Sequence, residues 1–402
     1  MRSSYPCSLA PFRALTLAAI VAGATHVVPV AAQETPKQPV VETAKKKVAE
    51  TPSLAPAPTA TQTGAKPVKA KRSEAEKEER AKEGAIFFSN DEPLVVTLTT
   101  DIKRLRHDKG DKSPWRSATL SYTDTAGKLV SIPTQVKTRG IWRLKNCDFP
   151  PVRFDFKRET TKGTLFHGLD KPKLTSYCRN DDTYEQHVIQ EMQLYRAYEL
   201  LTTNSHKVRL LQLTYVDSAS GKTEAKRYAF FYEEPDALAA RLGTRLVKLK
   251  GAVPDDLEPF HKALFGVFEY FVGNTDFSAF ALHNVELLWQ PDGTVIPVPY
   301  DFDFSGAVNA RYATTDPKLT ITHVRDRLFR GYCGDPEDFK KVFALFNEKK
   351  DAIYGLYSDQ VGKLMRPQIV KETLDYYNDF YKTINDQRSA NREIIKACLD
   401  GR

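Results

Sequence analysis

One stretch of the sequence, residues 273–306 (GNTDFSAFALHNVELLWQPDGTVIPVPYDFDFSG), constrains the fold more than any other. Two β-rich runs joined by a Pro-Asp-Gly turn predict a hairpin between residues 285 and 299. A hairpin brings its two ends together, so the polar residues that flank it should converge. They are Asp276, Asn284, Asp301 and Asp303. Three carboxylates at one place repel each other unless a cation neutralises them, so the stretch predicts a cation site.

Three kinds of protein use such a cluster. Hard oxygen ligands suit magnesium or manganese, and protein kinases have the same order of a base-like Asp, a metal-binding Asn and, after a hairpin, a metal-binding Asp. Asp301-Phe302-Asp303 also fits the D-x-D motif of nucleotide-sugar glycosyltransferases, although no doubly wound α/β pattern precedes it. A binding module without catalytic activity is the third reading, in which the carboxylates hold a structural calcium or a cell-envelope ligand.

The first 85 residues are expected to lie outside the folded domain. Basic residues, a short apolar run and Val30-Ala31-Ala32 predict a secretory signal peptide at residues 1–32. Residues 33–85 are rich in Ala, Pro, Thr, Lys and Glu, so we expect a disordered basic linker that tolerates deletion through about Lys82. The protein should therefore be exported, to the periplasm or the extracellular space, with no transmembrane segment after cleavage.

The charge distribution narrows the possible binding partners. Much of the net charge of +8 comes from lysines and arginines before residue 73, and the rest of the sequence has no basic patch interleaved with aromatic residues, so nucleic acid is not an expected partner.

Four cysteines follow the predicted cleavage site, and an even number in an oxidising compartment favours disulfides with three possible pairings. Cys147 and Cys178 flank one predicted β-layer and are the first expected pair.

The folded part divides into two halves of different character. Residues 86–234 contain mostly strand-like runs, with turn signals at Ala126-Gly127 and Ser220-Gly221, and one helix from Tyr184 to about Leu201. Residues 235–402 are mostly helical apart from the hairpin. We therefore expect an α+β fold with a β-rich N-terminal lobe and a helical C-terminal lobe.

Four further residues are candidates for binding a phosphorylated cofactor. Arg139 precedes a glycine after a strand, which lets the backbone approach an anion while the guanidinium binds it. Lys173 lies on a short strand 18 positions before Glu191, and in kinases a strand lysine that holds ATP phosphates pairs with a helix glutamate; unrelated surface charges would look the same. Glu233 lies at the end of the last strand-like run of the β-rich half. In kinases, the segment at this point connects the two lobes and hydrogen-bonds adenine through its backbone.

These residues together resemble the CotH family of atypical, spore-coat-type protein kinases and, more distantly, the HipA-like kinases. The resemblance covers roughly residues 130–310, and neither a Gly-x-Gly-x-x-Gly loop nor a His-Arg-Asp triplet is present. It depends on five short motifs: Arg139-Gly140 before Pro150-Pro151, the helix containing Glu191, Asn274-x-Asp276, His283-Asn284, and Pro299-Tyr300-Asp301-Phe302-Asp303 before Ser305-Gly306.

The resemblance implies a two-lobed kinase fold, ATP and Mg²⁺ (or Mn²⁺) as cofactors, and a hydroxyl group on a protein or small molecule as the acceptor. Asp276 would be the catalytic base, and Asn284 and Asp301 the metal ligands with Asp303 beside them. Lys173 and Glu191 would form the pair that positions ATP. The protein is expected to act as a monomer.

Overall fold

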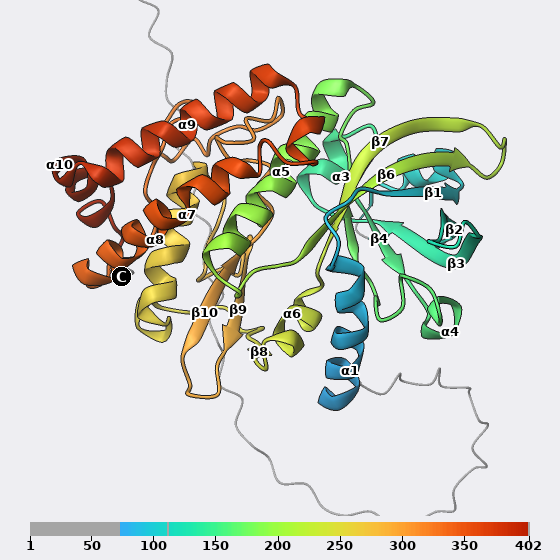
Figure 1. Ribbon diagram of the computed structural model, residues 1–402, viewed down its shortest axis with the longest axis horizontal. Helices are drawn as coiled ribbons and strands as arrows, with labels where there is room; N and C mark the ends of the chain where they lie inside the picture. Colours follow the sequence, from blue (N-terminus) through green and yellow to red (C-terminus); the bar gives the residue numbers. More distant parts are fainter. Residues whose placement is uncertain (1–72, 111, 401–402) are drawn as a thin grey trace, which may run out of the picture. The chain divides into compact units, whose positions relative to one another are not determined.

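The computed structural model describes residues 73–110 and 112–400, which have an α+β fold (Figure 1). The predicted signal peptide (1–32) and the predicted linker up to residue 72 lie outside the described residues. All described residues belong to one compact unit.

Seven strands close into a barrel in the order β1-β2-β3-β4-β5-β7-β6. Neighbouring strands are antiparallel, except that β1 and β6 run parallel where the barrel closes. The strands are β1 (Leu94–Thr100), β2 (Arg116–Thr123), β3 (Leu129–Thr138), β4 (Val152–Asp155), β5 (Lys173–Thr175), β6 (Val208–Asp217) and β7 (Thr223–Tyr232). The hairpins predicted at Ala126-Gly127 and Ser220-Gly221 are confirmed, since they join β2 to β3 and β6 to β7.

The barrel interior is apolar because side chains alternate along each strand. In β3 the even-numbered residues from Ile132 to Thr138 are buried, whereas the odd-numbered ones are exposed or half-buried. The interior contains packed aromatic rings, among them Phe154, Phe166 and Phe231. The odd-numbered residues of β3 therefore face outward, and the last of them lie near the candidate site.

A second apolar core joins the long helices, which lie on the side away from the barrel, with α5 next to it (Figure 1). The long helices are α5 (Asp182–Leu201), α7 (Pro259–Val272), α8 (Pro336–Gly355) and α9 (Pro367–Asn385). A small sheet of order β10-β9-β8 packs beside α7 and consists of β8 (Arg245–Leu246), β9 (Val285–Trp289) and β10 (Val295–Pro299). The predicted hairpin is thus confirmed as β9 and β10.

Short helices complete the chain. The short α-helices are α2 (Ile102–His107), α3 (Trp142–Asn146), α4 (Arg158–Thr161), α6 (Pro235–Arg241) and α10 (Gln387–Ala390). The 3₁₀ turns are Ile86–Phe88, Pro254–Asp256 and Gly362–Leu364, and a π-turn covers Asn391–Ile395. None of the helices within residues 73–400 is long and apolar enough to cross a membrane.

The last part of the predicted linker is folded, so its predicted boundary at residue 85 is wrong. Residues 74–85 form helix α1 (Glu74–Ala85), which starts at a capping box made by Ser73 and Glu76. Arg80 is buried and donates hydrogen bonds to the carbonyl oxygens of Gly168 and Leu169. Helix α1 is therefore part of the domain and packs against α6 and the loop that precedes β5.

Two disulfides connect distant segments of the described chain. The predicted pair Cys147–Cys178 is confirmed and ties the end of α3 to the segment after β5. The second disulfide, Cys333–Cys398, ties the C-terminal segment to the loop before α8. Each disulfide lies a few residues from an arginine that lines the cleft described next, Arg143 and Arg330 respectively.

Candidate functional site

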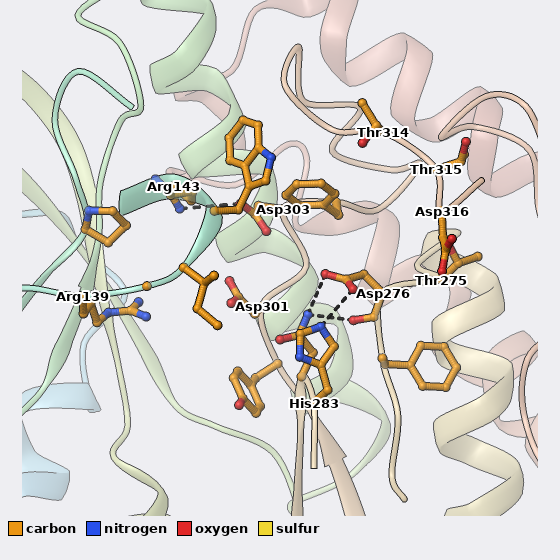
Figure 2. A pocket seen from close by; sticks show the side chains of 18 of the residues that line it. Arg139, Arg143, Thr275, Asp276, His283, Asp301, Asp303, Thr314, Thr315 and Asp316 are labelled. Carbon is orange, nitrogen blue, oxygen red and sulfur yellow. Dashed lines mark hydrogen bonds and ion pairs between the residues drawn. The ribbon is translucent and has the colours of Figure 1, made fainter. Parts of the chain in front are cut away.

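A cleft of about 760 Å³ contains six of the eight predicted site residues. Residues from the hairpin ends and the loop after α7 form one wall, and residues from the loop after β3, from α3 and from β5 form the other. Figure 2 shows Arg139 and Arg143 on one side of the cleft and Asp276 and Asp301 on the other. The six are Arg139, Lys173, Asp276, Asn284, Asp301 and Asp303. The predicted convergence of the four polar residues that flank the hairpin is therefore confirmed.

The hairpin register brings Asn284 and Asp301 together. Pro299 of β10 pairs with Val285 of β9, and the Tyr300 N–H donates to the Asn284 carbonyl, so both chains leave the sheet at the same level. Asn284 and Asp301 both have left-handed backbone, with φ of 54° and 64°. This conformation is uncommon outside glycine and is retained where surrounding contacts enforce it, often at functional sites.

One of the enforcing contacts comes from α5. The backbone N–H of Asp301 donates a 2.8 Å hydrogen bond to the hydroxyl of Tyr195, which is buried between Tyr232 and Phe302. This contact fixes the turn at Asp301 and leaves its carboxylate in the cleft. Tyr195 was not a predicted site residue, because a hydroxyl that binds a distant backbone group has no local signature in the sequence.

Asp276 is held by three hydrogen bonds from its own loop. Its carboxylate accepts from His283 Nε2 at 2.9 Å and from Asn284 Nδ2 at 3.2 Å, while its backbone N–H donates to Asn274 Oδ1. The hydrogen bond to Asp276 raises the pKa of His283. Since about half of the Asp276 side chain is exposed, the carboxylate is both oriented and accessible.

Asn284 connects this loop to the hairpin. Its Nδ2 also donates to the Asp276 carbonyl at 2.7 Å, so the amide nitrogen is directed at Asp276. The amide oxygen is then the atom of Asn284 that remains for a cation. Together with the Asp301 carboxylate it supplies hard oxygen donors. Among the described residues, no group of three or more His, Cys, Asp and Glu is arranged to hold a metal.

Asp303 lies deeper than the other acids. It is 5% exposed, accepts a 3.0 Å hydrogen bond from the Tyr312 hydroxyl, and lies 3.8 Å from Nη1 of Arg143. Burial, followed by the nearby charge of Asp301, raises the pKa of Asp303 to about 7. Arg143, which was not among the predicted site residues, also donates to the Ser176 carbonyl and is the main counter-charge of Asp303.

The opposite wall is cationic. The Arg139 backbone N–H donates to the Pro151 carbonyl, which fixes the turn that carries the arginine. Lys173 Nζ lies 5.2 Å from the ring centres of both Tyr232 and Tyr300. Burial, followed by the charge of Arg139, lowers the pKa of Lys173 to about 8. This wall therefore presents two cations across the cleft from Asp276 and Asp301.

Two predicted residues do not line the cleft, and the structure corrects their expected contacts. Glu191 is buried, and it forms no ion pair with Lys173 among the described residues. The cations whose charges lower the pKa of Glu191 are instead Arg143 and Arg139. Burial, followed by the charges of Asp303 and Asp301, raises the pKa of Glu191 well above its usual range.

Glu233 is engaged elsewhere. Its carboxylate forms a two-pronged contact with Arg241, its N–H donates to the Lys207 carbonyl, and its own carbonyl accepts from His206. Its backbone groups are therefore already paired and are not offered to a ligand. The sequence placed this residue correctly at the end of a strand but could not reveal the partners on α6 and before β6.

The chemistry of the cleft follows from these positions. One oriented carboxylate (Asp276), two oxygen donors on a strained hairpin end (Asn284 and Asp301) and two opposing cations (Arg139 and Lys173) surround one space. Such an arrangement suits a ligand that carries anionic groups and a divalent cation. Comparison with protein-family models finds no match for this chain, and comparison with curated proteins finds none either.

Proposed function

We propose that this protein is an exported, atypical kinase that transfers the γ-phosphoryl group of ATP to a hydroxyl group on a protein or a small molecule. The observation that carries the proposal is the convergence of Asp276, Asn284 and Asp301 at one hairpin end, opposite Arg139 and Lys173. Phosphoryl transfer depends mainly on positioning and charge neutralisation, and both walls of this cleft supply those.

The donor set fits magnesium better than a structural calcium. Calcium sites use about six to eight oxygen ligands, whereas magnesium is commonly held by one or two carboxylates with substrate phosphates completing its shell. The cleft offers the carboxylate of Asp301 and the amide oxygen of Asn284. A magnesium ion held there would neutralise the phosphate oxygens of the nucleotide.

The remaining residues have distinct proposed roles. Asp276 orients the acceptor hydroxyl and takes its proton as the oxygen forms its bond to phosphorus and the bond to the ADP oxygen breaks. The hydrogen bonds from His283 and Asn284 hold this carboxylate in place. Lys173 and Arg139 neutralise the negative charge on the transferred group. Arg143 balances Asp303 behind the site.

The proposal includes a two-lobed kinase-like arrangement and export. The separate apolar cores of the barrel and of the long helices support the first. The N-terminal signal pattern and two disulfides support the second, because disulfides persist in oxidising compartments.

Thermal unfolding with nucleotide and metal tests the proposal. We expect the melting temperature to rise when ATP and magnesium are present together, and to rise little with either alone. A ligand at 100 times its dissociation constant adds roughly 2.7 kcal/mol to the unfolding free energy. A rise with calcium alone would favour a binding module, and a rise with a nucleotide sugar and manganese but not with ATP would favour a glycosyltransferase.

Mass spectrometry after incubation with ATP and magnesium then tests for turnover. The acceptors are a mixture of secreted proteins, the protein itself and small hydroxyl compounds. We expect transferred phosphate with the parent protein and almost none with Asp276→Asn. Asp292→Asn, at the far turn of the same hairpin, is the matched control and should behave as the parent does.

A further inference from the structure

A row of cations crosses the outer face of the barrel and ends in the cleft. The strand register pairs Lys137 of β3 with Arg153 of β4, and Arg153 with Lys173 of β5. Residues directly opposite each other project to the same face of a sheet, and the burial pattern of β3 shows that this face is the outside of the barrel. Arg139 follows Lys137 by two positions and so lies on the same side. These four residues are called the cationic row.

Four neighbouring cations make up the row, and none of them has a carboxylate partner among the described residues. Some other cations of the barrel have carboxylate partners, as Arg116 has Asp108 and Lys157 has Asp155, whereas Arg209 and Lys226 form no salt bridge in the described part of the chain. Within residues 73–110 and 112–400, no salt bridge includes a member of the cationic row. Like charges directly opposite each other destabilise a sheet, so this arrangement has a cost in the absence of a ligand.

Two atoms of the row are also buried without a hydrogen-bond partner. They are the Nε atoms of Arg139 and Arg153. A buried N–H group without a partner costs free energy comparable to a lost hydrogen bond. The acids whose charges act on Lys173 are Glu286 and Asp301, both at the cleft end of the row. In the distal half, the strand register places Arg153 between two cations, Lys137 and Lys173.

The dimensions and flanking groups of the row indicate the shape of its ligand. Neighbouring strands lie about 4.8 Å apart, so Lys137 and Lys173 are separated by roughly 10 Å along a line. Within the described part of the chain, the aromatic rings that contact the lysines of the row lie at its two ends: Trp115 lies 5.4 Å from Lys137 Nζ, and Tyr232 lies 5.2 Å from Lys173 Nζ. Single-stranded nucleic acids need aromatic platforms for successive bases, so a thin chain of charges fits this row better.

We propose that the cationic row binds a linear chain of phosphates, of the inorganic polyphosphate class, with one end in the cleft at Lys173 and Arg139. The distal phosphates then contact Arg153 and Lys137, which are not among the residues proposed to bind the phosphates of the nucleotide. Lysine and arginine form charge-assisted hydrogen bonds with phosphate oxygens, and the negative charge of the phosphates offsets the repulsion within the row. This inference rests on the proposed function, because it takes the cleft end of the row as a phosphate site.

Isothermal titration calorimetry with the full mature chain tests the inference. The probes are long-chain polyphosphate and tripolyphosphate, and the variant is Lys137→Gln combined with Arg153→Gln. We expect the affinity of this variant for long-chain polyphosphate to fall roughly tenfold or more, because charge-assisted hydrogen bonds are lost. Its affinities for tripolyphosphate and for magnesium-ATP should stay within about twofold of the parent's. Melting of the ligand-free variant should rise slightly, because repulsion within the row is relieved.

Lys128→Gln combined with Lys226→Gln is the matched control, since both lysines are exposed on the same barrel and lie outside the row. An equal loss of long-chain affinity in this control would overturn the inference, because the binding would then depend on net charge only. Equal affinity of the parent for polyglutamate or for an oligothymidylate would overturn it as well.

The outcome separates this inference from the proposed function. Asp301→Asn should weaken magnesium-ATP binding and leave long-chain polyphosphate binding intact. If Asp301→Asn changes neither affinity, the proposed function fails and the row can still bind its chain. If the row variant binds the long chain as the parent does, the inference fails and the proposed function is unaffected.

Discussion

Replacing Arg80 by methionine should destabilise the whole domain, although the sequence suggested that this segment is a dispensable linker. Arg80 Nε donates to the Gly168 carbonyl at 3.1 Å, and Nη2 donates to the Leu169 carbonyl at 2.6 Å. Asp170 lies 3.5 Å from the same guanidinium, whose side chain is 10% exposed. Methionine keeps the length of the side chain and removes both hydrogen bonds.

The expected magnitude follows from these contacts. A hydrogen bond to a charged group contributes about 1.5–3 kcal/mol, and the apolar burial of methionine offsets part of the loss, so we expect a net cost of about 3 kcal/mol. That is a large fraction of the roughly 5–15 kcal/mol that stabilises a typical domain. Urea unfolding followed by circular dichroism measures the cost directly.

Lys77→Met on the same helix is the matched control. Lys77 has one i,i+3 ion pair with Glu74 on the surface, which is worth well under 1 kcal/mol. We therefore expect its cost to be within about 0.5 kcal/mol of zero. Equal costs for Arg80→Met and Lys77→Met would refute the reasoning, since α1 would then be attached to the domain without contributing to its stability.

Three further predictions concern the site and its supports. Burial raises the pKa of Asp303 to about 7, above its value in the unfolded chain. The protonated carboxyl therefore stabilises the metal-free fold at low pH, and this stability is lost as pH rises through about 7. In urea unfolding, the stability advantage of Asp303→Asn over the parent should grow between about pH 5 and pH 8, and a constant difference would contradict this. Gly273→Ala should cost more than about 2 kcal/mol in thermal unfolding, because φ is +67° and the new Cβ would lie 2.0 Å from the Tyr376 hydroxyl; a Tyr376→Phe background should recover only part of the loss. Replacing Cys147 and Cys178 by serine should cost about 2–4 kcal/mol in the same assay, and a loss below about 1 kcal/mol would show that the disulfide is not needed to hold α3.

Local patterns predicted much of the fold. Alternating apolar residues and turn signals identified the strands around Ala126-Gly127 and Ser220-Gly221, and apolar periodicity identified most of α5. The closure of the barrel was not predicted, because the parallel pairing of β1 with β6 joins segments more than a hundred residues apart. Helix α1 was missed since it is highly charged, although the Ser73-x-x-Glu76 capping box is readable in the sequence.

The candidate site was predictable where one hairpin defines it. Asp276, Asn284 and Asp301 converge because the chain between them folds back on itself, and this can be read from a turn. Contacts between distant elements could not be read in this way. The partner of Asp303 is Arg143 on α3, and the cationic row depends on strand register, which no single stretch of sequence reveals.

The central claim is that the hairpin end holds a metal–nucleotide complex while Asp276 acts on the acceptor. Magnesium-dependent ATP binding by calorimetry, measured on Asp301→Asn and Asp276→Asn with Asp292→Asn as the control, tests it most directly. We predict that Asp301→Asn weakens binding strongly, because a hard cation loses a charged ligand. Asp276→Asn should bind nearly as the parent does and lose about 100- to 10,000-fold in phosphate transfer. If Asp301→Asn binds magnesium-ATP as tightly as the parent and the control do, the claim is contradicted.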